Sequence, residues 1–317
     1  MFSTIADRLV VCLALLTMLS QVTSAEPTKY ARYRIGDKVA YGIVEGERVH
    51  ELEGKFAQWK PTGKTHELYE VELLVPTEPR QVLAMAGNYN SHISEGVRTI
   101  KLTTTSEVIY DPQTGQFETV TNTEEMKKIP GIVPHKFRKP QVFFKSPSSL
   151  TAHDTEIVIP KNSSGDIHFE AEMVLVIGRR AKDVPLESAL DYVLGVTCGN
   201  DVTERTWQKE DIQWWRAKAS DTFGPCGPFI VSGIDYDNLR LRLRLNGMVK
   251  QDEPTSRMIH SVPQIVSILS HHITLLPGDL IFTGTPQVTS EIKTGDDVEV
   301  ELEGVGVLRN RVIREAE

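Results

Sequence analysis

Apolar and polar residues follow a strand pattern most clearly at residues 165–178. Residues 173–177 form an unbroken apolar run rich in valine, and a glycine stands at each end of the longer stretch. Such a run, bounded by turn-forming residues, predicts a buried strand. Because side chains alternate along a strand, His168, Glu170 and Glu172 would point to one face and the apolar residues between them to the other.

Glu170 and Glu172 would be unusual on this strand, since ionised carboxylates beside apolar residues need a cation or a cage of hydrogen bonds. A hard divalent ion such as Mg2+, Mn2+ or Ca2+ takes oxygen ligands and suits such a pair. An edge strand whose acidic face lies in solvent would carry the same residues. The strand by itself leaves both interpretations open.

The rest of the chain alternates in short runs that predict further strands and a few short helices. Residues 29–53 suggest a small β-meander, because Gly-Asp and Glu-Gly-Glu separate the alternating runs. Residues 54–76 are polar with a possible helix at 66–74, and the turn-forming pairs at 216–228 predict a loop. Further strands are predicted at 82–86, 107–110, 116–120, 141–145, 194–201, 229–231, 239–245 and 280–282, and helices at 186–192, 203–209 and 263–269.

Pro76 and Pro79 mark the expected hinge between two parts of the chain. We expect a small N-terminal β domain at 26–78 and a larger domain at 79–317. Residues 97–139 are polar and threonine-rich, and they look like an insertion in the larger domain. An insertion of this length could be a lid over a site, a subunit contact or a decoration.

Residues 1–25 have the pattern of a secretory signal peptide. Arg8 precedes an apolar run at 9–19, and small residues follow as an expected cleavage site. The sequence therefore predicts an exported protein, periplasmic or secreted, with no membrane contact after cleavage; an uncleaved anchor is the alternative. The mature chain would keep Cys198 and Cys226, for which buried thiols are expected and a disulfide is the alternative.

The charge and the missing motifs exclude several classes of function. With 317 residues, a net charge of -8 and a pI near 5.7, the protein is not expected to bind nucleic acid or anionic membranes. The sequence has no Gly-x-Ser-x-Gly elbow, no His-Glu-x-x-His motif, no phosphate-binding loop of the Walker type and no Gly-x-Gly-x-x-Gly after a strand. Serine hydrolase, zinc protease and nucleotide-binding functions therefore lack their usual residues.

A histidine and a glutamate follow the predicted strand at 82–86. Gly87 and Asn88 end that strand, and a helical turn after them would bring His92 and Glu95 side by side. A carboxylate beside a histidine orients the ring and raises its basicity, as a general base requires. A surface pair at a strand end is the alternative.

Several short motifs occur in a fixed order along the chain. They are Gly87-Asn-Tyr-x-x-His-x-x-Glu95, Phe144-Lys145, His168-x-Glu-x-Glu172, Gly199-Asn-Asp-Val-Thr-x-Arg205, Lys218-x-x-Asp221 and Pro277-Gly-Asp-x-Ile-x-Thr-Gly-Thr285-Pro286. Together they resemble the fumarylacetoacetate hydrolase family, over residues 30–313. The resemblance implies a mainly β, α+β fold, in which a mixed β-sandwich roll lies behind the small N-terminal β domain. It also implies a homodimer.

The resemblance further implies roles for named residues. The metal ligands, for Mg2+ or for Mn2+ or Ca2+, would be Glu170, Glu172 and Asp201. The catalytic residues would be His92, Glu95 and Lys218. The residues that contact the substrate would be Gln208 and Thr285, while His168 is expected beside the metal ligands rather than among them.

Two departures from the family pattern bear on the substrate. The insertion at 97–139 is longer than in the small acylpyruvase-like members. Residue 85 is methionine, where fumarylacetoacetate hydrolase itself has a further metal-site aspartate. Together with Glu95, this methionine makes the acylpyruvase and isomerase branch the nearer match.

The function that the resemblance implies is a divalent-metal-dependent hydrolase that cleaves a carbon–carbon bond in a 2,4-dioxo acid. His92, oriented by Glu95, would deprotonate water, and Lys218 would stabilise the enolate that leaves. Isomerisation or decarboxylation of a 2-hydroxy-dienedioate by the same residues is the alternative within the family. A non-catalytic β-protein stabilised by a metal is the alternative from another class.

Overall fold

The computed structural model describes residues 26–96, 107–110, 117–120 and 133–316. The predicted signal peptide, residues 1–25, and most of the 97–139 insertion lie outside these ranges, so their roles stay predictions. The side chains of residues 94–96 also lie outside the description. Within the described residues, no helix is long and apolar enough to cross a membrane.

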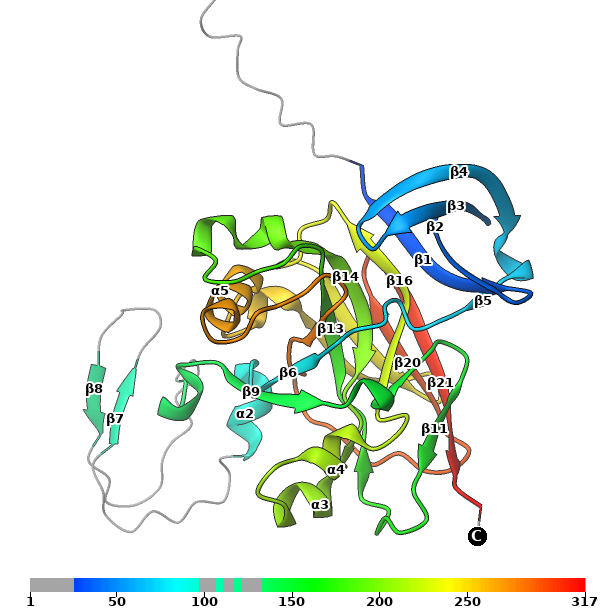
Figure 1. Ribbon diagram of the computed structural model, residues 1–317. Helices are drawn as coiled ribbons and strands as arrows, with labels where there is room; N and C mark the ends of the chain where they lie inside the picture. The colour runs from blue at the N-terminus through cyan, green and yellow to red at the C-terminus, as the bar shows by residue number, and fades with distance from the viewer. Residues whose placement is uncertain (1–25, 97–106, 111–116, 121–132, 317) are drawn as a thin grey trace, which may run out of the picture.

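A twelve-stranded sheet runs through the described part of the molecule (Figure 1). Most of its strands lie side by side in the order β4 (Gln58–Glu67), β3 (Arg48–Lys55), β2 (Lys38–Glu45), β1 (Thr28–Ile35), β16 (Gly224–Ser232), β14 (Val193–Asn200), β13 (Ala171–Ile177), β19 (Leu280–Phe282), β6 (Val82–Ala86) and β9 (Gln141–Lys145). Two short strands, β5 (Glu72–Leu73) and β10 (Leu150–Thr151), pair beside this path with β1 and β16. Because β1 pairs with β16, the N-terminal strands continue the sheet of the larger domain.

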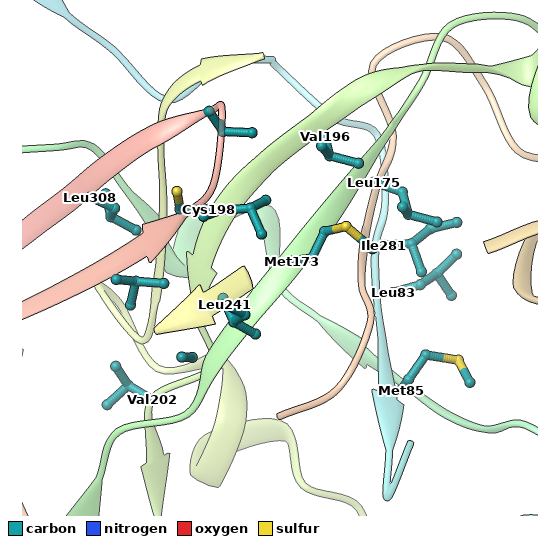
Figure 2. Close-up of a cluster of buried hydrophobic side chains, with 14 of the residues drawn as sticks. Leu83, Met85, Met173, Leu175, Val196, Cys198, Val202, Leu241, Ile281 and Leu308 are labelled. Carbon is teal, nitrogen blue, oxygen red and sulfur yellow. The ribbon is translucent and has the colours of Figure 1, made fainter. Parts of the chain in front are cut away.

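A five-stranded sheet packs against one face of the first sheet. Its order is β11 (Glu156–Ile159), β21 (Gly306–Arg314), β20 (Asp297–Leu302), β17 (Arg240–Leu245) and β18 (Met248–Pro254). Met173 and Leu175 of β13 share a buried apolar cluster with Leu241 of β17 and Leu308 of β21 (Figure 2). The two sheets therefore enclose one core, and the predicted fold class, mainly β with an N-terminal β domain, is confirmed.

Shorter elements complete the described chain. The remaining strand pairs are β12 (Ile167–His168) with β15 (Thr203–Glu204), and β7 (Glu107–Tyr110) with β8 (Phe117–Val120). The α-helices are α2 (Asn90–Gly96), α3 (Arg205–Glu210), α4 (Trp215–Ala219) and α5 (Val262–His272). The 3-10 helices are η1 (Leu68–Glu70), η3 (His135–Phe137), η4 (Pro147–Ser149), η5 (Leu186–Tyr192) and η6 (Thr255–Arg257). The predicted N-terminal meander, the central strands and the hairpin in the insertion are confirmed.

The predicted helix at 66–74 is wrong for most of its length. Residues 58–67 form β4, and only Leu68–Glu70 make a single 3-10 turn. β4 is the outermost strand of the large sheet, and most of its side chains are exposed, so it lacks the apolar alternation that predicts a strand. Pro61 lies in this edge strand, where a missing N–H is tolerated.

The predicted loop at 216–228 is wrong for most of its length, and only residues 220–223 are a loop. Trp215–Ala219 form helix α4, and β16 begins at Gly224. Pro225 and Pro228 obscure this strand in the sequence, since proline cannot donate a hydrogen bond to a ladder. The structure accommodates Pro228 where the register between β14 and β16 shifts.

Cys198 and Cys226 are both buried and free, so the expected thiols are confirmed. They lie on neighbouring strands, but Cys226 is opposite Gly199 in the register, so the two side chains point to opposite faces of the sheet. Side chains that point apart in this way cannot form a disulfide without movement of the backbone. Burial raises the pKa of the Cys198 thiol to about 12, which keeps it protonated.

Candidate active site

Three buried carboxylates meet at one end of β13 and β14. Glu172 lies in β13, Glu170 precedes that strand, and Asp201 directly follows β14. The antiparallel register places Ala171 opposite Asn200, and the Asp201 amide donates to the Glu170 carbonyl at 2.8 Å. One oxygen from each carboxylate lies within 4.8 Å of the others. The pairing of two strands thus brings together the three residues that the sequence predicts as metal ligands.

Two cationic side chains hold Glu170 in place. Lys218 Nζ donates to Glu170 Oε2 at 2.7 Å and to Asp201 Oδ2 at 2.6 Å, while Arg205 Nη2 donates to Glu170 Oε1 at 2.6 Å. Burial would raise the pKa of Glu170, but Lys218 and Arg205 hold that pKa well below its usual range. Burial would likewise lower the pKa of Lys218, but Asp201 and Glu170 raise it. Lys218 therefore carries its charge at neutral pH, inside helix α4 rather than in the predicted loop.

Lys145 is a second lysine at the carboxylates, and the sequence predicts no role for it. Its Nζ donates to Asp201 Oδ1 at 2.7 Å, to the Phe223 carbonyl at 3.2 Å and to the carbonyl of Lys218. Burial lowers the pKa of Lys145, and Asp201 offsets part of that effect. The alternation along this strand could have indicated the role of Lys145. Lys145 shares a strand face with Phe143, which is partly buried, and a lysine buried there needs an acidic partner.

A backbone amide donates a hydrogen bond to Glu172. The Gly284 amide donates to Glu172 Oε2 at 2.7 Å. Burial, together with Asp201 and Glu170, raises the pKa of Glu172 well above its usual range. Gly284 has a φ of +97°, and a Cβ there would lie 2.8 Å from the Cβ of Asn88, so the position requires glycine. A cation beside the three carboxylates would relieve the repulsion that Glu172 meets.

His92 lies in α2 with one ring nitrogen engaged. Nδ1 is 2.7 Å from the carbonyl oxygen of Gln287, and because a carbonyl only accepts, Nδ1 carries the proton of the neutral ring. Nε2 then keeps a lone pair and has no hydrogen-bond partner among the described residues. The loop of Pro286 and Gln287 that holds the ring is itself tied to the site, because the Pro286 carbonyl accepts from Gln251 Nε2 and Gln251 Oε1 accepts from the Ala171 amide, between the two glutamates. Glu95 follows in the same helix, but its side chain is outside the described residues, and the His92–Glu95 pair stays a prediction.

Thr285 and Gln208 lie next to residues that bind the carboxylates. Thr285 follows Gly284, which donates to Glu172, and Gln208 contacts Arg205, which donates to Glu170. Thr285 Oγ1 accepts from Gln251 Nε2 at 2.9 Å, which leaves its own O–H available to a ligand. Gln208 Oε1 accepts from Arg205 Nη1 at 2.9 Å, which leaves its amide N–H groups available. Gln251 is fully buried, and its Oε1 accepts from the Ala171 amide at 3.0 Å. Nothing in the sequence distinguishes Gln251 from an ordinary hairpin residue.

Comparison with known proteins agrees with this geometry. The family model described as fumarylacetoacetate (FAA) hydrolase C-terminal matches residues 116–313, and the model Rv2993c-like, N-terminal matches residues 28–76. Protein Rv2993c of Mycobacterium tuberculosis is 37% identical over 289 residues, which are 88% of this chain and 95% of that protein. The chain belongs to the fumarylacetoacetate hydrolase family.

Solved structures of the fumarylacetoacetate hydrolase fold include similar proteins from two mycobacteria. A 2-hydroxyhepta-2,4-diene-1,7-dioate isomerase from Mycobacterium marinum is 35% identical, with a TM-score of 0.73 over 92% of this chain and 100% of that one. A 5-carboxymethyl-2-hydroxymuconate delta-isomerase from Mycobacterium smegmatis is 32% identical, with a TM-score of 0.74 over 90% of this chain and 100% of that one. Both matches extend over nearly the whole described fold.

Fumarylacetoacetate hydrolase family enzymes typically bind a divalent metal, and the residues of this chain fit one. Oxygen ligands stand about 2.0–2.6 Å from Mg2+ or Ca2+, so those that share an ion lie within about 5 Å of one another. The three carboxylates meet that limit. Three basic side chains, Lys145, Lys218 and Arg205, pair with two of them, Asp201 and Glu170.

Two residues that the sequence resemblance singles out, Met85 and His168, are not among the three carboxylates. Met85 packs with Leu83 in the core between the sheets (Figure 2), so its side chain does not face the metal ligands. The three carboxylates are therefore in place although residue 85 is a methionine and not an aspartate. The ring of His168 contacts Thr289 Oγ1 at 2.9 Å and Asp166 Oδ1 at 3.1 Å, and it is not part of the carboxylate group.

Proposed function

We propose that the chain is a divalent-metal-dependent enzyme that hydrolyses a carbon–carbon bond in a 2,4-dioxo acid. The observation that carries this proposal is the meeting of three buried carboxylates with Lys218. His92, whose Nε2 is unpaired among the described residues, is held by the loop that follows Thr285. A 2-oxo acid can chelate one ion through two oxygens.

The residues of the chain divide the chemistry among them. His92 Nε2 accepts a proton from water, and the oxygen of that water adds to the distal carbonyl of the substrate. The bond from that carbonyl carbon to the next carbon breaks, and the electron pair stays on the departing enolate, which the charge of Lys218 stabilises. Thr285 and Gln208 donate hydrogen bonds to the carboxylate end. A divalent ion held by the three carboxylates would act as a Lewis acid toward the chelating oxygens.

An isomerase or decarboxylase of 2-hydroxy-dienedioates is the second candidate. The similar proteins from Mycobacterium marinum and Mycobacterium smegmatis carry isomerase names. The same residues could serve an isomerisation, with His92 taking the proton of the 2-hydroxyl oxygen and returning it to a carbon of the diene, and no water consumed. A non-catalytic metal-binding protein is disfavoured, because ion binding alone gains nothing from a buried lysine on two of the ligands.

Product analysis separates these candidates. The protein, supplied with Mg2+ or Mn2+, is incubated in 18O-labelled water with 2,4-dioxo acids and, separately, with 2-hydroxy-dienedioates. We expect pyruvate and a second acid from an acylpyruvate, with one labelled oxygen in the second acid. Isomerised or decarboxylated dienedioates without any cleavage of the dioxo acids would assign the second candidate. The His92→Gln variant is the control for turnover that does not depend on this site.

Export and assembly are separate proposals. We propose that residues 1–25 direct export and are then removed, on the strength of the apolar run at 9–19. Mass spectrometry of the secreted chain should find a mature N-terminus near Glu26; a secreted chain that retains residue 1 contradicts the cleavage. We also propose a homodimer, from the family resemblance, and light scattering that gives the mass of one chain would refute it.

A further inference from the structure

Gln287 adopts a left-handed backbone conformation that residues other than glycine seldom adopt. Its φ is +52°, in the loop that follows β19. Such conformations persist only where the surrounding contacts enforce them, and they gather at functional sites. The contacts of Gln287 therefore indicate what the conformation is for.

The side chain of Gln287 anchors the residue to the second sheet. The Asp252 amide donates to Gln287 Oε1 at 2.9 Å, and Gln287 Nε2 donates to the Asp252 carbonyl at 3.2 Å. Asp252 lies in β18, the edge strand of that sheet. The side-chain amide of Gln287 therefore takes the backbone hydrogen bonds that a further strand would make at this edge. Both ends of the glutamine amide are thereby fixed to a regular strand.

The main chain of Gln287 holds helix α2. Its carbonyl accepts from His92 Nδ1 at 2.7 Å, and its amide donates to Ser91 Oγ at 3.1 Å. Ser91 Oγ in turn donates to Glu253 Oε2 at 2.6 Å, next to Asp252 in β18. One residue thus connects the edge strand to two successive residues of the helix that carries His92.

We propose that Gln287 is a positioning residue, which fixes His92 as the Nδ1–H tautomer and makes Nε2 the atom that exchanges a proton. The effect on turnover rests on the proposed function, whereas the tautomer does not. Glutamate at this position lacks an N–H for the Asp252 carbonyl. Glycine keeps the left-handed backbone accessible but loses both side-chain hydrogen bonds.

Nitrogen NMR of the histidine rings measures the tautomer directly and needs no substrate. The protein is produced with 15N-labelled histidine, loaded with Mg2+ and examined near pH 8, where an ordinary histidine is neutral. The signals of His92 are those that disappear in His92→Gln. We expect a protonated Nδ1 and an unprotonated Nε2. The reverse tautomer in the unsubstituted protein would overturn the proposal, whatever the variants do.

Gln287→Gly and Gln287→Glu test the role of the side chain. Both are expected to give a mixture of tautomers and to lower kcat about tenfold or more with KM within about twofold, since general-base catalysis contributes about 10²–10⁴-fold. Val288→Ala, at an exposed neighbour in the same loop, is the matched control and should change neither. An unchanged tautomer and an unchanged kcat in both Gln287 variants would overturn the proposal. The expected tautomers without turnover of any 2-oxo acid would support the positioning role and refute the proposed function.

Discussion

Replacing Asp201 with asparagine is expected to abolish metal binding at the three carboxylates and to lower kcat/KM about a thousandfold, or about 4 kcal/mol of transition-state stabilisation. Both oxygens of Asp201 contact lysines, at 2.7 Å from Lys145 Nζ and 2.6 Å from Lys218 Nζ. Asparagine keeps the shape but removes the negative charge that attracts a divalent ion. It also leaves two buried lysines short of a partner, which costs about 3–5 kcal/mol of folding stability.

Calorimetric titration with Mn2+, thermal unfolding and turnover measure these effects of Asp201→Asn. Asp154→Asn is the matched control, because Asp154 pairs with Arg309 at the surface and its side chain is 51% exposed. The unsubstituted protein and the control should bind one ion per chain and unfold at a higher temperature with Mn2+ than with a chelator. Equal Mn2+ affinity in Asp201→Asn and in the control would show that the ion binds elsewhere.

Replacing Lys218 with methionine is expected to separate metal binding from turnover. The Lys218 ammonium lies 2.7 Å from Glu170 Oε2 and 2.6 Å from Asp201 Oδ2, where it repels any divalent ion that these carboxylates bind. Its loss should therefore keep or strengthen the affinity for Mn2+. The same charge stabilises the departing enolate in the proposed reaction, and loss of one such group lowers kcat about 10²–10³-fold.

Lys250→Met is the control for Lys218→Met, because Lys250 is an exposed lysine on β18. Titration with Mn2+ and steady-state kinetics are measured on both variants. A fall of kcat in Lys218→Met with Mn2+ affinity retained is the expected pattern. If kcat were retained, Lys218 would only balance the buried carboxylates, and the enolate would need another stabilising group.

The central strands could be predicted from the sequence because both of their faces are buried. β13 and β6 lie between other strands of the large sheet, so their residues are almost uniformly apolar. Against that background, Glu170 and Glu172 were conspicuous as charges that need a partner. β4 could not be predicted in this way, because an edge strand with most side chains in solvent has no such pattern.

Other parts of the site depend on contacts that local sequence does not encode. Helix α4 is five residues long, which is too short to be stable by helix propensity alone. Lys145 meets Asp201 across 56 positions, and Gln251 meets the Ala171 amide across 80. The family resemblance, rather than periodicity, placed Asp201 and Lys218 beside the two glutamates. It supplied no role for Lys145 or Gln251.

The central claim is that the three carboxylates bind one divalent ion. A crystal structure of the protein soaked with Mn2+ and oxalate tests it most directly, with data recorded at an X-ray wavelength at which manganese scatters anomalously. Oxalate resembles the enolate of a 2-oxo acid and should occupy the coordination positions that the protein leaves open. We predict one strong anomalous peak about 2.0–2.6 Å from an oxygen of each of Glu170, Glu172 and Asp201. A peak at another place, or an Asp201 carboxylate turned away from the two glutamates, would contradict it.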